Sequence, residues 1–181
     1  MKLSVRSADL QKKLENLHKI TKTKTTLSVL NYLLMEVTDS EIQFTASDLE
    51  VTLVSKVMPE EVKETGSVCV LADTFAEIIK KLPDCVLTIT DNKNAIVIKS
   101  KGGTFKIPCV SSEDFPIGRE PSEENIFSIP SSVLANGINK TYFAIAPDSE
   151  REYRPTLCGV FADFKQDKCC FVLFKVCKHT T

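Results

Sequence analysis

The chain has 181 residues, of which 43% are hydrophobic and 26% are charged, and its formal net charge is −1. This composition is ordinary for a soluble globular protein, and the length suits one generous domain or one and a half small ones. No apolar run approaches the roughly 18–20 residues that span a bilayer, and no secretory segment follows the first two residues, so we expect a cytoplasmic protein without a membrane partner. Seven cysteines without a CxxC pair favour reduced, mostly buried thiols.

Charge is segregated along the chain although its sum is close to zero. Residues 1–35 carry seven Lys or Arg against two acids, whereas residues 36–66 carry two against eight. Such a chain can present one basic and one acidic face. For any single segment, a chance fluctuation in sign is the simpler interpretation.

The first part of the chain predicts a strand, a helix and three further strands. The first strand is Lys2–Arg6, and Ser7 is the expected N-cap of the helix. The apolar stripe of this helix consists of Leu10, Leu14, Leu17 and Ile20, with Lys12, Glu15, Asn16 and Lys19 opposite. Alternating apolar residues then predict strands at Val29–Val37, Glu41–Thr45 and Leu49–Val57. An acidic connector, Met58–Gly66, ends this unit.

The same order recurs in the next part of the chain. Ser67–Leu71 predicts a strand, and Ala72–Leu82 predicts a helix with Asp73, Glu77, Lys80 and Lys81 outside. The buried stripe of this helix consists of Phe75, Ile78, Ile79 and Leu82. Three more strands are predicted at Val86–Thr90, Ala95–Ser100 and Thr104–Val110.

A third repeat starts after a linker at Ser111–Ser122 and is incomplete. We expect a strand at Asn125–Ile129 and a helix at Ser131–Ala144, buried through Val133, Leu134, Ile138 and Thr141. The last predicted strands are Thr156–Phe164 and Cys169–Val176. The pattern predicts an α+β fold in which helices pack on one face of antiparallel sheets. We expect a complete two-repeat domain at 1–120 and an incomplete one at 121–181.

Enzymatic function is disfavoured by the motifs. The sequence contains no G-x-S-x-G, no phosphate-binding glycine loop and no Rossmann fingerprint. Asp48 and Glu50 are expected to share one face of a strand, where a solvated edge is the simpler reading than acid–base chemistry. His18 and His179 are expected at the surface. A metal cluster of Cys169, Cys170, Cys177 and His179 is disfavoured because adjacent strand residues point to opposite faces. We therefore expect no metal and no cofactor.

Five stretches in order resemble a known family. TLSVLNYLL at Thr26–Leu34 is similar to its first meander strand, and SDLE at Ser47–Glu50 resembles its TDLE motif. EDFP at Glu113–Pro116 is similar to its linker motif. INKTYFA at Ile138–Ala144 and RPTLCGVF at Arg154–Phe161 resemble parts of its second domain. The family is the bacterial sliding clamp, the beta subunit of DNA polymerase III, and the similarity runs from Met1 to about Val172.

The resemblance implies the DNA-clamp fold and the role of a processivity factor in DNA replication. Such a clamp surrounds double-stranded DNA without reading its sequence and tethers the polymerase, and the resemblance implies DNA polymerase and a clamp loader as its partners. The implied DNA-binding residues are Lys12, Lys19, Lys22, Lys24, Lys80, Lys81, Lys140 and Arg154. The implied subunit interface consists of Thr74, Ile78, Leu82, Phe105 and Ile107, and the implied partner-peptide groove includes Leu157.

The sequence also departs from the family pattern. The family has three domains, whereas this chain carries one and a half, so it resembles a truncated or N-terminal part. FVLFKVCKHTT, at Phe171–Thr181, stands where the family has a TD-x-H-R-L-like motif. One alternative is a clamp-derived interaction module or remnant, without DNA tethering, that engages in self-association or binds a full clamp. Another is an enzyme on an unrelated α+β scaffold, since fold does not dictate function.

Overall fold

The computed structural model describes residues 1–21, 28–49, 51–92, 94–113, 115–116, 128–150, 153–165 and 168–172. The chain divides into two compact units, Met1–Glu120 and Pro121–Thr181, which are described separately below.

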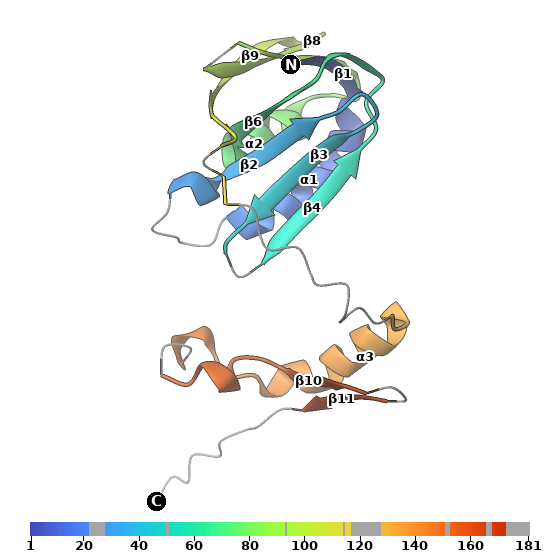
Figure 1. The fold of residues 1–181 in the computed structure, drawn as a ribbon, viewed down its shortest axis with the longest axis vertical. Helices are drawn as coiled ribbons and strands as arrows, with labels where there is room; N and C mark the ends of the chain where they lie inside the picture. Colours follow the sequence, from blue (N-terminus) through green and yellow to red (C-terminus); the bar gives the residue numbers. More distant parts are fainter. Residues whose placement is uncertain are drawn as a thin grey trace, which may run out of the picture. The chain divides into compact units, whose positions relative to one another are not determined.

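The described residues of unit 1 form two α-helices and nine strands, several of which are labelled in Figure 1. The helices are α1 (Ser7–Thr21) and α2 (Ala72–Lys81). The strands of the first repeat are β1 (Lys2–Arg6), β2 (Tyr32–Val37), β3 (Ile42–Ser47), β4 (Thr52–Val57) and β5 (Glu61–Glu64). Those of the second repeat are β6 (Gly66–Leu71), β7 (Val86–Asp91), β8 (Ala95–Ser100) and β9 (Gly103–Val110). The sheet order is β4-β3-β2-β6-β9-β8-β7-β1-β5, with every pair antiparallel.

The two repeats exchange their first strands. β1 pairs with β7 of the second repeat, so that Lys2 lies opposite Thr90. Reciprocally, β6 pairs with β2 of the first repeat, so that Leu71 lies opposite Tyr32. Three strands of each repeat are therefore flanked by the first strand of the other, and β5 of the first repeat adds to the outer edge of β1.

The connector after β4 contains a strand that the sequence did not predict. Its residues Glu61–Glu64 form β5, which pairs with the free edge of β1. Pro59 separates β4 from β5, and the amide of Glu60 donates to the carbonyl oxygen of Ser4 at 2.8 Å. The strand could not be recognised from its acidic sequence, because an exposed edge strand carries charged residues and lacks the alternation of apolar residues that predicts a strand.

Both helices pack against the sheet as their stripes predict. In Figure 1, α1 lies behind β3 and β4, and α2 lies behind β2 and β6. Leu10, Leu14 and Leu17 of α1 are at most 2% exposed, and Phe75 and Ile79 of α2 are fully buried. These side chains join the inward-facing strand residues in one core, within which the rings of Phe44 and Phe75 lie 6.0 Å apart. The expected α+β fold of unit 1 is confirmed.

Ser7 does not cap its own helix as predicted. Its fully buried hydroxyl donates to the carbonyl oxygen of Pro83 at 2.8 Å and accepts from the amide of Cys85 at 3.0 Å. The amide of Ser7 in turn donates to the carbonyl oxygen of Cys85. The segment that follows α2 thus supplies the partners of Ser7, and the two repeats are joined at this point.

The meander after α1 departs from its prediction at two places. Residues Ser28–Asn31 form a 3-10 helix, so β2 begins at Tyr32 instead of Val29. Leu49 has a φ of 76° and is 60% exposed, in a turn between β3 and β4. In that turn the amide of Val51 donates to Oδ1 of Asp48 at 2.7 Å. Asp48 therefore lies in a turn and not on a strand, and Glu50 lies outside the described residues.

The first part of the predicted linker is anchored to unit 1. Phe115 is 4% exposed and packs with Leu34 and Cys69, beside Val29 and Tyr32. The linker motif is therefore partly buried. The sequence did not predict this burial, because a single apolar residue forms no periodic pattern.

In unit 2, the described residues form α3 (Ser131–Thr141), three 3-10 turns and a hairpin of β10 (Phe161–Phe164) and β11 (Cys169–Val172). The 3-10 turns are Tyr142–Ala144, Asp148–Glu150 and Pro155–Leu157, so the predicted strand at Thr156–Phe164 is confined to its last four residues. The described residues Ser128–Pro130 form no strand.

The predicted burial of α3 is wrong. No residue of this helix is buried, and Val133, Leu134 and Ile138 are 47%, 37% and 39% exposed. The hairpin reaches the helix at Gly137, where an added Cβ atom would lie 2.4 Å from the ring of Phe171. A two-stranded sheet is too small to bury a whole helix face, so the stripe stays partly in solvent.

Candidate functional site

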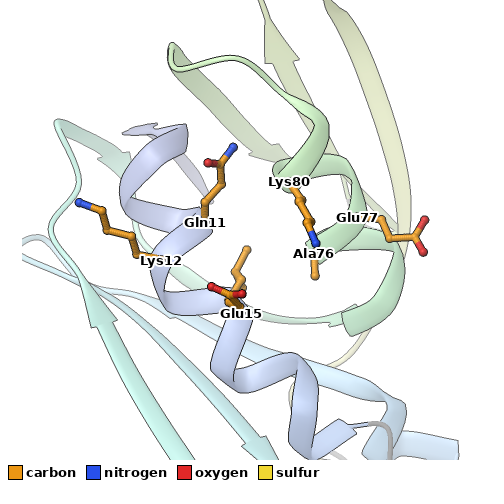
Figure 2. Close-up of a pocket in the computed structure, with 7 residues that line it drawn as sticks. Gln11, Lys12, Glu15, Ala76, Glu77 and Lys80 are labelled. Atoms are coloured by element: carbon orange, nitrogen blue, oxygen red, sulfur yellow. The ribbon is translucent and has the colours of Figure 1, made fainter.

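A groove of ≈ 510 Å³ runs between α1 and α2 on the surface of unit 1 (Figure 2). It is lined by Gln11, Lys12, Leu14, Glu15, Ala76, Glu77 and Lys80. Figure 2 shows Gln11 directed toward the space between the helices and Lys80 running along α2 toward Ala76, with Lys12 and Glu77 directed outward on either side. Leu14 is buried beneath, so polar side chains on an apolar floor line the groove.

Helical periodicity explains why these side chains meet. Gln11 and Glu15 are four residues apart on α1, as are Ala76 and Lys80 on α2, so each pair lies on one flank of its helix. Each pair also follows a buried apolar residue by one position: Leu10 and Leu14 on α1, Phe75 and Ile79 on α2. The groove is therefore built from equivalent positions in the two repeats.

Gln11 joins the two walls of the groove. Its Nε2 donates to the carbonyl oxygen of Ile79 at 2.8 Å and to that of Leu82 at 3.0 Å. The carbonyl groups at the end of a helix lack the usual partners of the next turn. The Gln11 amide binds that of Ile79, which also accepts from the amide of Leu82 at 3.3 Å, and that of the C-cap residue Leu82. The sequence analysis missed Gln11, although a long amide directly after a buried leucine is the type of residue that reaches a neighbouring helix.

The groove carries both signs of charge. Lys12 and Lys80, both expected to bind DNA, lie in it with Glu15 and Glu77. Lys81 is exposed and forms an ion pair with Glu77 at 3.9 Å, a geometry that contributes little to stability in water. The polar face of the helices therefore carries both positive and negative charges. A count of its lysines alone does not show this.

The other expected DNA-binding residues are dispersed. Lys140 is exposed near the end of α3, and Arg154 is exposed before the turn Pro155–Leu157, both in unit 2. Lys19 belongs to α1, but its side chain lies outside the described part of the structure, as do Lys22 and Lys24 altogether.

A second, smaller groove of ≈ 180 Å³ lies on the other flank of α2. Two expected interface residues, Thr74 and Ile78, line it together with Asp73, Glu77 and Lys81. Phe105 is half-buried against the core. Leu82 and Ile107 are 8% and 0% exposed, so their side chains are core residues and Ile107 has no surface to offer a neighbour. This corrects the expectation for Ile107, whose inward position on β9 decides its burial.

Leu157 is half-buried at the end of its 3-10 turn, and its amide donates to the carbonyl oxygen of Arg154 at 3.1 Å. Among the described residues, no group of three or more His, Cys, Asp or Glu is arranged to hold a metal ion. No helix within the described ranges is long and apolar enough to cross a membrane.

Residues 1–118 match the family described as "DNA polymerase III beta subunit, N-terminal domain". The "Beta sliding clamp" of Bacillus subtilis is 28% identical over 168 residues, which cover 88% of this chain and 44% of the relative. The "Beta sliding clamp" of Vibrio harveyi is 32% identical over 145 residues, which cover 80% of this chain and 100% of that sequence.

Solved structures of sliding clamps are also similar to this chain. The crystal structure of a DNA polymerase sliding clamp from Pseudomonas aeruginosa with ligand is 29% identical and has a TM-score of 0.83. The similarity covers 92% of this chain and 44% of that one, so this chain spans less than half of the length of the Bacillus and Pseudomonas proteins. The fold is thus the DNA-clamp fold that the motifs implied, and the chain belongs to the family of the DNA polymerase III beta subunit, the sliding clamp.

Proposed function

We propose that this chain is the N-terminal part of a DNA sliding clamp, a processivity factor without catalytic activity of its own. In this proposal the complete clamp surrounds duplex DNA without sequence specificity and tethers a DNA polymerase in the cytoplasm after loading by a clamp loader. Unit 1 is one complete clamp domain, and unit 2 is an incomplete second one. Membership of the family is the observation that carries the proposal.

The helix face of unit 1 supplies the contact with DNA. Lys12 and Lys80 lie in one groove, one from each repeat, so their ammonium groups can approach the same stretch of phosphate backbone. Contacts with phosphates attract any duplex and carry no sequence information. The glutamates in the groove weaken this attraction, which suits a contact that must slide.

The remaining implied residues have secondary roles. By the resemblance, Lys19, Lys22, Lys24 and Lys81 contribute further positive charge from the first domain, and Lys140 and Arg154 contribute it from the second. Thr74, Ile78 and Phe105 join a neighbouring subunit, and Leu157 contributes to the groove for partner peptides.

Binding of the full chain to a labelled DNA duplex across a salt series tests the proposal. We expect weak binding that falls as salt rises, because each phosphate contact releases counterions. The double variant Lys12→Glu/Lys80→Glu should abolish binding at low salt. Its milder form, Lys12→Ala/Lys80→Ala, should reduce the slope of log K against log salt by about two, one for each lysine.

The matched control is Lys99→Glu/Lys106→Glu, which makes the same change of charge on exposed positions of β8 and β9. If the control variant loses as much affinity as Lys12→Glu/Lys80→Glu, the net charge of the chain determines its affinity for DNA. The assignment of the DNA contact to the helix face would then be wrong. Undiminished binding by the groove variant leads to the same conclusion.

A further inference from the structure

Gln11 joins the two backbone positions that directly precede the lysines of the groove. It precedes Lys12 on α1, and its amide nitrogen donates to the carbonyl oxygen of Ile79 at 2.8 Å. Ile79 in turn precedes Lys80 on α2. A bond between these two positions fixes how far apart the next two side chains begin. Gln11 therefore sets the spacing of Lys12 and Lys80 in the groove.

Further polar contacts hold the same end of α2 against the start of α1. Nε of Arg6 donates to Oδ1 of Asp84 at 3.1 Å, in an exposed ion pair that contributes little by itself. The fully buried hydroxyl of Ser7 binds backbone groups of Pro83 and Cys85. The end of α2 is thus held at several points, and it cannot shift along α1 without breaking these bonds.

The second repeat lacks such polar side chains. Its residues at the positions equivalent to Arg6, Ser7 and Gln11 have hydrocarbon side chains: Leu71, Ala72 and Ala76. These side chains neither donate nor accept hydrogen bonds. At these equivalent positions, polar side chains therefore hold the two helices at one joint of the repeats and not at the other. Gln11 belongs to the joint that carries both lysines.

Both lysines are available to bind an anion. Within the part of the chain that the structure describes, neither Lys12 nor Lys80 forms an ion pair. Figure 2 shows Lys12 directed outward and Lys80 running along α2. When one ammonium group has bound a phosphate, the other is already near the backbone, so its effective concentration is high. Two contacts at a fixed spacing therefore strengthen each other.

We propose that Gln11 is a positioning residue that makes Lys12 and Lys80 bind the phosphate backbone as one coupled pair. The inference rests on the proposed DNA contact, and it adds that the two lysines do not act independently. Gln11 contributes no charge and acts through the backbone of α2. Its loss would let the end of α2 shift against α1, and each lysine would then bind separately.

A double-mutant cycle on the full chain tests the coupling. Affinity for a labelled duplex at low salt is measured for wild type, Lys12→Ala, Lys80→Ala and the double variant. The product of the two single losses should exceed the loss in the double variant by at least about fivefold, as it does for coupled sites. The same cycle is then measured on Gln11→Met, which keeps the length of the side chain but removes its N–H donors. There the product and the double loss should agree within about twofold.

The salt dependence of binding supplies a second readout. Gln11→Met should reduce the slope of log K against log salt by about one, although it removes no charge, because one lysine then loses its phosphate. A loss of stability alone does not change the number of counterions that the folded protein releases. Circular dichroism verifies the fold, and Gln11→Leu is a second variant without the donors. The cycle in wild type tests the coupling without any change at Gln11.

The matched control is Gln43→Met. It removes a part-buried amide that donates to Oε2 of Glu36 on the neighbouring strand at 3.1 Å, and it should keep both the coupling and the slope. Four results would overturn the inference and leave the DNA contact in place: independent lysines in wild type, coupling that survives both changes at Gln11, an unchanged slope in these variants, or an equal loss of coupling in the control. Absence of salt-dependent duplex binding by wild type would instead overturn the proposed function, and the inference with it.

Discussion

Gln11 of the first repeat donates its side-chain amide to the backbone carbonyl oxygen of Ile79 in the second, at 2.8 Å. A second bond from the same nitrogen reaches Leu82. Since both acceptors belong to the end of α2, the side chain fixes the distance between the two helices that carry the proposed DNA contacts.

Replacement of Gln11 by alanine should destabilise unit 1 by about 1–3 kcal/mol, because two carbonyl groups at the end of α2 lose a partner in a part-buried site. Urea unfolding, followed by circular dichroism, measures the change. Lys13→Ala, at an exposed position of the same helix, should change stability by less than about 0.5 kcal/mol. Equal effects of the two substitutions would show that the amide bonds contribute nothing.

Removal of the acidic charges from the groove should strengthen the binding of DNA. We expect Glu15→Gln/Glu77→Gln to bind a duplex roughly two- to tenfold more tightly at low salt, with the difference shrinking as salt screens the charges. The matched control is Glu60→Gln/Glu61→Gln at the start of β5, which removes two exposed acids outside the groove. A gain as large in the control would assign the effect to net charge.

Unit 2 should exchange its backbone amides faster than unit 1. The described residues of unit 2 contain no buried side chain, whereas unit 1 has a large core and a smaller buried cluster around Phe115. Local opening requires less free energy where fewer apolar groups are buried. Hydrogen exchange at low protein concentration should show protection at least about tenfold lower in residues 126–181 than in 1–110. Uniform protection in a verified monomer would contradict this expectation.

The cysteines should differ in their reactivity toward an alkylating reagent. Burial, followed by the charge of Asp91, raises the pKa of Cys109, so its thiol stays protonated at pH values where a free thiol begins to ionise. Cys170 is exposed on β11. Mass spectrometry after brief treatment at about pH 8 should find Cys170 modified before Cys109, because the thiolate is the reactive form. Modification in the reverse order would mean that the core opens more readily than its packing indicates.

The sequence predicted the elements best where apolar periodicity is strong. The stripes Leu10–Leu14–Leu17 and Phe75–Ile79 predicted both helices of unit 1 and their buried faces, and β8 begins and ends at its predicted residues. Alternation failed at Leu49, because a positive φ in a hydrogen-bonded turn leaves no trace in a hydrophobic pattern. The predicted burial of α3 also failed. An apolar stripe shows which face of a helix would be buried, but it does not show that another element covers that face.

The candidate site was predictable in part. Lys12 and Lys80 follow from helical geometry, but their common groove depends on how the repeats pack, which no local pattern contains. The same holds for Ser7, whose partners Pro83 and Cys85 lie in the other repeat. Ile107 was assigned to a surface by resemblance, and its burial followed only from the register of β9 with β8.

The exchanged first strands also govern how this chain can fold during synthesis. β1 precedes the rest of the first repeat in the sequence, yet its partner β7 is made only after that repeat, β6 and α2. Contacts so distant in sequence form late and slowly, because the entropy cost of closing a long loop comes before the contacts stabilise the fold. During synthesis, the edge of β2 in the first repeat therefore stays unpaired until β6 has been made. Aggregation and chaperone binding should be greatest during this interval of translation.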